Sequence, residues 1–260
     1  TLYNEQLMPA IEAEGININR TENETRIKGW VKRFFERELR PLLIPVGLDP
    51  SHPFPQVANK SLNFIVRLSG KDAFGRENDI AIVKVPRVLP RLIRMPDKVS
   101  DGKTLIVSLS SVIRAHHVDL FPGRVVSQFS QFRVTRHSDL AVDEEDVKNL
   151  RTALRQGLVH RHYGQAVRLE VSAGCSEHLS QFLLKQFELP SGALYRVHGP
   201  VNLVRLTQLI DLVDRPDLCF PPYAAAFPTQ MNQSQSDFEQ LKQGEFLNDH
   251  PFVLFAGVLE

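Results

Sequence analysis

Hydrophobic positions recur every three or four residues in the first part of the chain, which is the spacing of one face of an α-helix. Residues 2–14 show a short version of this pattern, and Gly15 stands where a helix stop is expected. A longer version begins behind the capping pattern at 21–24 and ends before Pro41. Its apolar positions are Ile27, Trp30, Val31, Phe34, Phe35 and Leu39. We therefore predict two helices, of which the second is strongly amphipathic.

Short apolar runs bounded by turn residues replace the helical spacing after residue 44, and such runs are typical of β-strands. The strands predicted in this way are 62–68, 79–85, 91–95, 104–109 and 124–136. Residues 110–121 have the spacing of one helix. Beyond them the predicted elements alternate between helices (from 143, after Ser176, and 201–212) and strands (166–172 and 193–199). This order predicts an α+β fold with a helical lead-in, a mixed or antiparallel sheet with packed helices, and a C-terminal linker.

Composition and charge exclude several classes of protein. Lys and Arg number 31 against 30 for Asp and Glu, and the net charge of +1 argues against a protein dominated by nonspecific nucleic-acid binding. The two cysteines, Cys175 and Cys219, are too few for a disulfide framework or a cysteine-rich zinc site, and they favour a reducing cytoplasm. No apolar run approaches the roughly 18–20 residues of a membrane-spanning helix. The acidic start does not have the pattern of a signal peptide.

Several longer runs together resemble the bacterial polyphosphate kinase family, and they follow one another in the order of that family. The most specific run is FRVTRHSDLAVDEED at 132–146. The others are HPFPQVANKSLNFIV (52–66), VKVPRVLPRLIRMP (83–96), YGQAVRLEV (163–171), LYRVHGPVNLVRLTQL (194–209) and RPDLCFPPYAAAFP (215–228). The chain is thus similar to an internal piece of such a kinase, centred on its head domain. The run at 238–255 departs from the family pattern, with Lys242, Glu245, Asn248 and Leu254 at positions where other residues are usual.

The resemblance implies three segments. They are the end of a helical N-terminal domain (1–43), the α/β head domain (44–213), and a linker that leads into the first C-terminal catalytic domain (214–260). In this family the enzyme moves the terminal phosphate of ATP to polyphosphate through a phosphohistidine and with magnesium. The phosphorylated histidine and the nucleotide-binding residues lie mainly in other domains. We therefore expect no catalytic residue and no cofactor in this chain, which alone would be inactive.

The partners that the resemblance implies are a second copy of the chain, polyphosphate, and the remaining N- and C-terminal domains of the same enzyme. It implies neither nucleic acid nor a transmembrane segment. The expected location is the cytoplasm, and peripheral association with the inner membrane stays open. Two alternatives are a stand-alone polyanion-binding protein and a complete phosphotransferase or hydrolase. The second would need His160, His162 or His198 as its acid or base.

One candidate for polyphosphate binding is an acid-free basic run. It holds Lys84, Arg87, Arg91 and Arg94. Polyphosphate carries about one negative charge per phosphate, and basic grooves that hold nucleic-acid backbones work in the same way, with guanidinium forks matching phosphate oxygens. The alternative, which the general exposure of Arg and Lys favours, is a solvated strand-and-loop surface paired to acids elsewhere. It stays a candidate for one wall of a polyanion path.

Two further pairs of arginines belong to the same hypothesis. Arg133 and Arg136 are three apart in a predicted strand, so they should face opposite sides of the sheet unless a bulge intervenes. The alternative for these two is structural pairing with Asp139 or with the acids at 143–146. Arg151 and Arg155 are four apart, share a helix face, and belong to an acid-free stretch that continues to Arg168.

Metal sites and nucleophilic triads find little support in the sequence. The histidine pairs are His116 with His117 and His160 with His162. A zinc site needs three or four converging ligands, and no carboxylate or further histidine stands at a suitable spacing. The four acids at 143–146 are explained by the positive end of a helix dipole. We therefore expect no metal in this chain.

Overall fold

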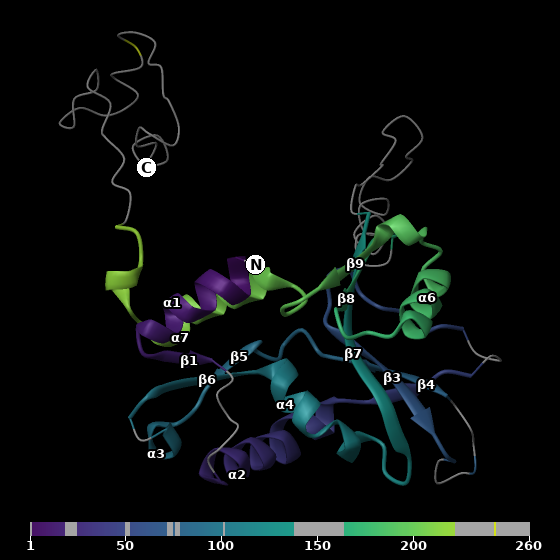
Figure 1. The fold of residues 1–260 in the computed structure, drawn as a ribbon, viewed down its shortest axis with the longest axis horizontal. Helices are drawn as coiled ribbons and strands as arrows, with labels where there is room; N and C mark the ends of the chain where they lie inside the picture. Colours follow the sequence, from purple (N-terminus) through teal and green to yellow (C-terminus); the bar gives the residue numbers. More distant parts are fainter. Residues whose placement is uncertain are drawn as a thin grey trace. The chain divides into compact units, whose positions relative to one another are not determined.

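The computed structural model describes residues 2–18, 25–49, 53–71, 75, 79–100, 102–137, 164–221 and 242 (Figure 1). By its contacts the chain divides into two units, 1–213 and 214–260. In the second unit the described residues include a 3-10 turn, Pro216–Leu218, before which Arg215 pairs with Asp217 at 2.7 Å. The domain limits that the resemblance implies stay predictions. None of the described helices is long and apolar enough to cross a membrane.

The larger sheet is the centre of the first unit. Among the described residues it has six strands in the order β2-β4-β3-β7-β8-β9. Its neighbouring strands are antiparallel except β8 and β9, which are parallel. The sheet is therefore mixed, and the predicted α+β class is confirmed. The strands are β2 (Pro45–Gly47), β3 (Asn63–Ser69), β4 (Ile80–Lys84), β7 (Val125–Arg136), β8 (Ala166–Ser172) and β9 (Leu194–Val197).

Side-chain alternation along β3 sends consecutive residues to opposite faces of this sheet. Phe64 and Val66 belong to one buried cluster, together with Phe35. Ile65 between them belongs to a second cluster, which also contains Leu179 of α6. Because both faces of β3 are covered here, Phe64, Ile65 and Val66 are apolar in succession, where a strand with one exposed face would alternate.

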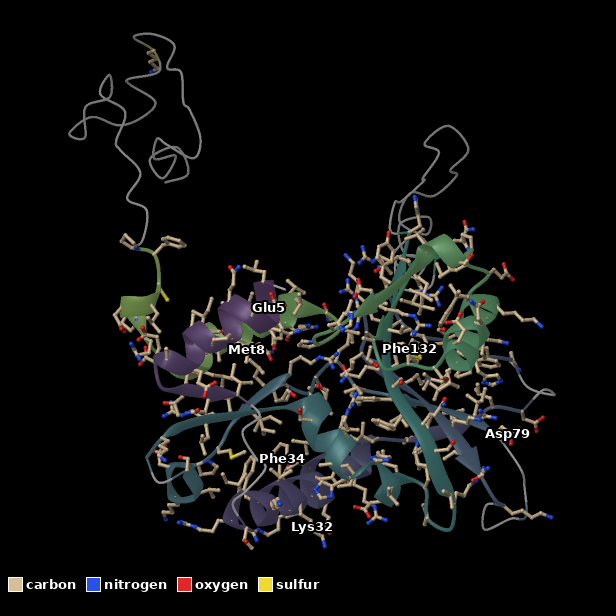
Figure 2. The ribbon with its side chains drawn as sticks, in the orientation of Figure 1. Glu5, Met8, Lys32, Phe34, Asp79 and Phe132 are labelled. Atoms are coloured by element: carbon tan, nitrogen blue, oxygen red, sulfur yellow. The ribbon has the colours of Figure 1, made fainter. Side chains whose placement is uncertain are left out.

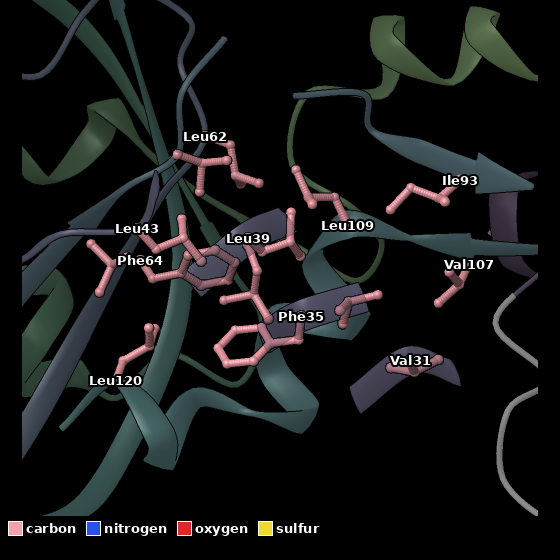
Figure 3. Close-up of a cluster of buried hydrophobic side chains, with 14 of the residues drawn as sticks. Val31, Phe35, Leu39, Leu43, Leu62, Phe64, Ile93, Val107, Leu109 and Leu120 are labelled. Carbon is pink, nitrogen blue, oxygen red and sulfur yellow. The ribbon is translucent and has the colours of Figure 1, made fainter. Parts of the chain in front are cut away.

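The amphipathic helix near the N-terminus covers the first of these faces. α2 (Thr25–Phe34) continues into a π-helical stretch, Phe35–Leu39, and a 3-10 turn, Arg40–Leu42. Its predicted apolar face is confirmed, because Ile27, Val31, Phe35 and Leu39 are buried. Figure 3 shows Phe35 and Leu39 beside Phe64 and Leu109. The other described helices here are α3 (Asp97–Ser100), α4 (Leu109–Ala115) and α6 (Glu177–Gln186).

A smaller sheet joins distant parts of the first unit. Among the described residues it has three strands in the order β1-β6-β5, with β1 parallel to β6. The helices that end at Ala13 and begin at Gln208 contribute side chains to one apolar cluster on this sheet, and Figure 1 shows them together. The elements are β1 (Ile16–Ile18), β5 (Leu92–Arg94), β6 (Thr104–Ser108), α1 (Met8–Ala13) after a π-helical stretch (Leu2–Leu7), and α7 (Gln208–Val213).

Two predicted helices are interrupted in the structure. The helix predicted over 110–121 ends at Ala115 and is followed by a 3-10 turn, His117–Leu120. Between them His116 leaves the helical region, and its ring stacks on Phe35 at 5.0 Å. The helix predicted over 201–212 starts instead with a 3-10 turn, Leu203–Thr207. Asn202 before it has φ +68°, a left-handed conformation that the periodicity of apolar residues does not signal.

The N-terminal cap of α6 shows how local sequence fixes an element. The Ser176 hydroxyl accepts a hydrogen bond from the backbone N–H of Leu179 at 3.3 Å. Behind the cap, Leu179, Leu183 and Phe187 are buried against the second face of the larger sheet. This cap satisfies one of the N–H groups that a helix start leaves without a partner.

The two cysteines should differ in reactivity. Cys175 is buried and Cys219 is exposed. Burial raises the pKa of the Cys175 thiol, so at neutral pH it carries even less thiolate, the reactive form. We expect a disulfide reagent such as Ellman's reagent to release one thiol per native chain rapidly, and the second only in guanidinium. A Cys219→Ser variant should lose the rapid phase. Two rapid thiols in the native chain would contradict the burial of Cys175.

Candidate anion-binding site

Three hollows in the first unit share Tyr3 and Pro200 among their lining residues, and we call them together the Tyr3 groove. Their volumes are about 710, 580 and 40 Å³. Each is built from the N-terminal helical segment, the loop after β9 and the strands beneath. Glu5 lines the first hollow and Met8 the second, and both are labelled on the N-terminal helix in Figure 2.

The N-terminal segment lies close against the loop that follows β9. A Cβ on Gly199 would lie 3.1 Å from Cδ1 of Tyr3, so a glycine here lets the tyrosine ring approach. Nearby, Asn4 Nδ2 donates a hydrogen bond to the carbonyl of His198 at 3.0 Å. Burial raises the pKa of the Tyr3 hydroxyl, so it stays a neutral hydrogen-bond donor at physiological pH.

The first hollow contains a cluster of two arginines around one carboxylate. Arg133 on β7 and Glu170 on β8 are direct cross-strand partners, and their side chains are 3.4 Å apart. Arg168 lies two residues before Glu170, so it shares that face and approaches the same carboxylate at 3.1 Å. The Arg168 guanidinium also lies 3.7 Å from the centroid of the Tyr195 ring. Two cations share one anion, which leaves the cluster with a net positive charge.

The third hollow is the smallest and holds an arginine with an unsatisfied donor. The backbone N–H of Arg91 donates to Gln208 Oε1 at 2.8 Å, which anchors the residue. Its Nη1 is buried without a hydrogen-bond partner among the described residues, as is Oδ1 of Asn202. Burial and then the charge of Arg205 lower the pKa of Arg91 to about 10. The protein therefore holds a guanidinium where its charge is disfavoured.

Known proteins identify the family of this chain. Residues 26–209 match the family described as the polyphosphate kinase middle domain. The chain belongs to this family. Among curated relatives, all 260 residues align at 49% identity with a polyphosphate kinase of Neisseria meningitidis serogroup C and at 47% with one of Pseudomonas aeruginosa. The chain spans 38% of the length of each of these relatives.

A solved structure has the same fold. A crystal structure of polyphosphate kinase from Porphyromonas gingivalis matches 99% of this chain and 36% of its own length, with a TM-score of 0.72. Sequence identity in this match is 20%, so it bears on the fold alone. The resemblance to polyphosphate kinases seen in the sequence is confirmed, and the groove described above belongs to a polyphosphate kinase middle domain.

The middle domain separates the members of the basic run. Lys84 is exposed at the end of β4, and Arg87 donates to the carbonyl of Asn59. Arg94 donates to the carbonyl of Leu212 at 3.3 Å and pairs with Asp97 at 3.7 Å. Of this run, Arg91 alone lines the Tyr3 groove. The side chains of this basic run therefore have separate surroundings and do not form one surface.

Arg133 and Arg136 also have different surroundings in the middle domain. The register between β7 and β8 shifts between Thr135 and Arg136, so a bulge does intervene. Even so, the Arg136 guanidinium donates to the carbonyls of Val57 at 3.0 Å and Gly164 at 2.8 Å. Arg133 lines the groove, whereas Arg136 holds three segments of backbone together. Arg151 and Arg155 lie outside the described residues, so their placement stays a prediction.

Two arginines of the groove were not candidates from the sequence. Arg205 lines the third hollow and Arg114, on α4, lines the second. Arg205 reaches the groove because α7 packs on β5, which brings together residues more than a hundred positions apart. Arg114 lies in a helix whose sequence shows only ordinary amphipathic spacing. No local signal marks either residue, whereas Arg168 belonged to a recognisably acid-free stretch.

Metal ligands do not cluster in the part of the chain that the structure describes. No group of three or more His, Cys, Asp or Glu side chains converges there. Both histidines of the first predicted pair make other contacts: His116 pairs with Asp119 at 3.5 Å, and His117 lies 4.8 Å from the Phe129 ring centroid. His160 and His162 lie outside the described residues. The chemistry that this arrangement supports is the binding of an anion.

Proposed function

We propose that this middle domain assembles a polyphosphate kinase and lines part of the path of its polyphosphate chain. The whole enzyme would transfer the terminal phosphate of ATP to polyphosphate through a phosphohistidine, using magnesium. Support comes from the relatives, which are named polyphosphate kinases and of which this chain spans 38%. ATP and magnesium would be held by the remaining domains. This chain by itself would be inactive and would reside in the cytoplasm.

The observation that carries the polyphosphate assignment is the charge of the Tyr3 groove. Two carboxylates line its three hollows, Glu5 and Glu170. The arginines that line them are Arg91, Arg114, Arg133, Arg168 and Arg205. A groove with this excess of guanidinium groups attracts a polyanion and releases its condensed counterions on binding. The net charge of the whole chain, +1, hides this local concentration.

Calorimetric titration with long-chain polyphosphate tests the assignment. We expect saturable binding at low salt that weakens steeply as salt rises, because each phosphate contact releases counterions. Arg168→Gln should reduce the slope of log affinity against log salt by roughly 0.7–0.9. The matched control is Arg37→Gln, because Arg37 is exposed and does not line the groove. Absence of binding at low salt would refute the polyphosphate path and leave assembly as the role.

The assembly role predicts a homodimer. Several large apolar side chains of the first unit are exposed, among them Val204 at 68% and Ile210 at 61%. Exposed apolar surface of this kind is common at subunit contacts. Sedimentation of the 29.5 kDa chain should give twice this mass, and Ile210→Glu, outside the Tyr3 groove, should shift the equilibrium toward the monomer. A monomer at every concentration tested would contradict this part of the proposal.

A further inference from the structure

We infer that Arg91 and Arg205 form a subsite for one tetrahedral oxyanion, a phosphoryl group, in the smallest hollow of the Tyr3 groove. This inference rests on the proposed function, because it identifies where in the groove a single phosphate is bound. It rests on four features of the described residues: an unsatisfied donor, an unpaired neighbouring cation, a lining free of carboxylates, and neutral donors around them.

The unsatisfied donor is fixed in position. The backbone of Arg91 is anchored by Gln208, the residue lines the hollow, and its Nη1 is buried without a partner among the described residues. A buried N–H group without a partner has lost its hydrogen bond to water and gained none in return. Nearly all such groups in native proteins have a protein, water or ligand partner. The Nη1 of Arg91 therefore points to an occupant.

The charge in the hollow also lacks compensation. The charge of Arg205, after burial, lowers the pKa of Arg91, and neither arginine forms an ion pair with a described residue. Two other arginines of the first unit do have carboxylate partners. Arg133 pairs with Glu170, and Arg196 pairs with Glu177 at 2.5 Å. Two neighbouring positive charges that lack a carboxylate partner attract an anion from solution.

The lining identifies the class of anion. No Asp or Glu lines the smallest hollow. Its neutral polar side chains are those of Tyr3, Ser108, Ser110, Gln131 and Asn202. Of these, Asn202 donates to the carbonyl of Lys60 at 3.4 Å and Ser108 donates to Ser111 Oγ at 2.8 Å. The Tyr3 hydroxyl and the Gln131 amide can donate hydrogen bonds without adding charge, and two guanidinium forks from separate elements suit the several oxygens of a phosphoryl group. The two larger hollows share Tyr3 and Pro200 with this one and therefore lie next to the subsite.

Phosphate-dependent stabilisation and polyphosphate titration, measured on the full 260-residue chain, test this subsite. Inorganic phosphate and pyrophosphate are added at constant ionic strength, with chloride as the reference, and the unfolding temperature is followed. We expect both anions to raise the unfolding temperature of the native chain in a saturable manner, because they bind the folded state. The rise should be lost in Arg91→Gln and in Arg205→Gln. It should persist in Arg87→Gln, a neighbour in the same run that bonds to Asn59 and does not line the groove.

Long-chain polyphosphate distinguishes the source of the phosphoryl group. Its affinity should fall about tenfold in Arg91→Gln, because a charge-assisted contact is lost. The polymer could fail to bind even the native chain while phosphate still stabilises it through Arg91. In that case the subsite holds free phosphate, and the proposed polyphosphate path is wrong. If the polymer binds the native chain and Arg91→Gln equally, the path stands and the subsite is wrong.

The competing occupant of the hollow is water. A hollow of about 40 Å³ can hold a water molecule that satisfies Arg91 Nη1 and Asn202 Oδ1. Water alone predicts no stabilisation by phosphate or pyrophosphate over chloride, and that result would overturn the subsite. Circular dichroism shows whether Arg91→Gln folds. If it does not fold, Arg205→Gln tests the subsite instead, because Arg205 is exposed and its replacement does not disturb the core.

Discussion

Replacing Phe35 by Ala is expected to lower the free energy of unfolding by about 3–5 kcal/mol. Phe35 is completely buried between the sheet and α4, and its ring stacks on His116 at 5.0 Å. Truncation would remove the buried area of a ring and leave a cavity among Leu39, Phe64 and Leu109 that the surrounding side chains cannot fill (Figure 3). Guanidinium unfolding followed by circular dichroism measures this change.

The neighbouring residue in the chain provides the control for this prediction. Phe34 is only partly buried, and its ring stacks on Trp30 at 5.1 Å. Phe34→Ala should lower the free energy of unfolding by about 1 kcal/mol, because a partly buried side chain removes less apolar area from water than a fully buried one. Equal effects of the two substitutions would show that α2 does not bury the face described here.

Replacing Glu170 by Gln is expected to weaken the fold and strengthen polyanion binding. Glu170 is the carboxylate that Arg133 and Arg168 share, and its side chain is 12% exposed. Removal of its charge leaves two guanidinium groups unpaired, which should cost about 2–3 kcal/mol of stability. The same removal makes the first hollow more positive, so the affinity for polyphosphate should rise and depend more steeply on salt.

An exposed glutamate provides the control for Glu170. Glu177 also pairs with an arginine, Arg196, but its side chain is 69% exposed. Exposed pairs contribute little, so Glu177→Gln should leave stability and polyphosphate affinity nearly unchanged. Denaturant unfolding and the calorimetric titration measure the two properties for both variants. A Glu170→Gln chain with native stability and unchanged affinity would contradict the role of the cluster.

The long periodic elements of this fold could be predicted from the sequence. The amphipathic face of α2 and the strand β7 appear at their expected places because their apolar patterns extend over ten or more residues. The strand β1 could not be predicted, because it has three residues and pairs with β6, nearly ninety positions away. Interruptions at His116 and Asn202 depend on a ring contact and a left-handed residue, and neither leaves a periodic signal.

The site was only partly predictable, for a related reason. Charge in the sequence identified Arg91 and Arg133 as candidates, but it could not separate them from Arg87, Arg94 and Arg136. That separation depends on which guanidinium finds a backbone carbonyl or a carboxylate once the chain has folded. Arg94 finds Asp97, which lies just beyond the acid-free run, and Arg136 finds two carbonyls. Arg205 joins the site only through the packing of α7.

Residue-resolved labelling of arginines with phenylglyoxal, with and without long-chain polyphosphate, tests the central claim most directly. The claim is that the Tyr3 groove contacts the polymer. We predict protection of Arg114, Arg168 and Arg205, which line the groove, and unchanged labelling of Arg37 and Arg40, which are exposed outside it. Protection confined to arginines outside the groove, or uniform labelling with and without the polymer, would contradict the account.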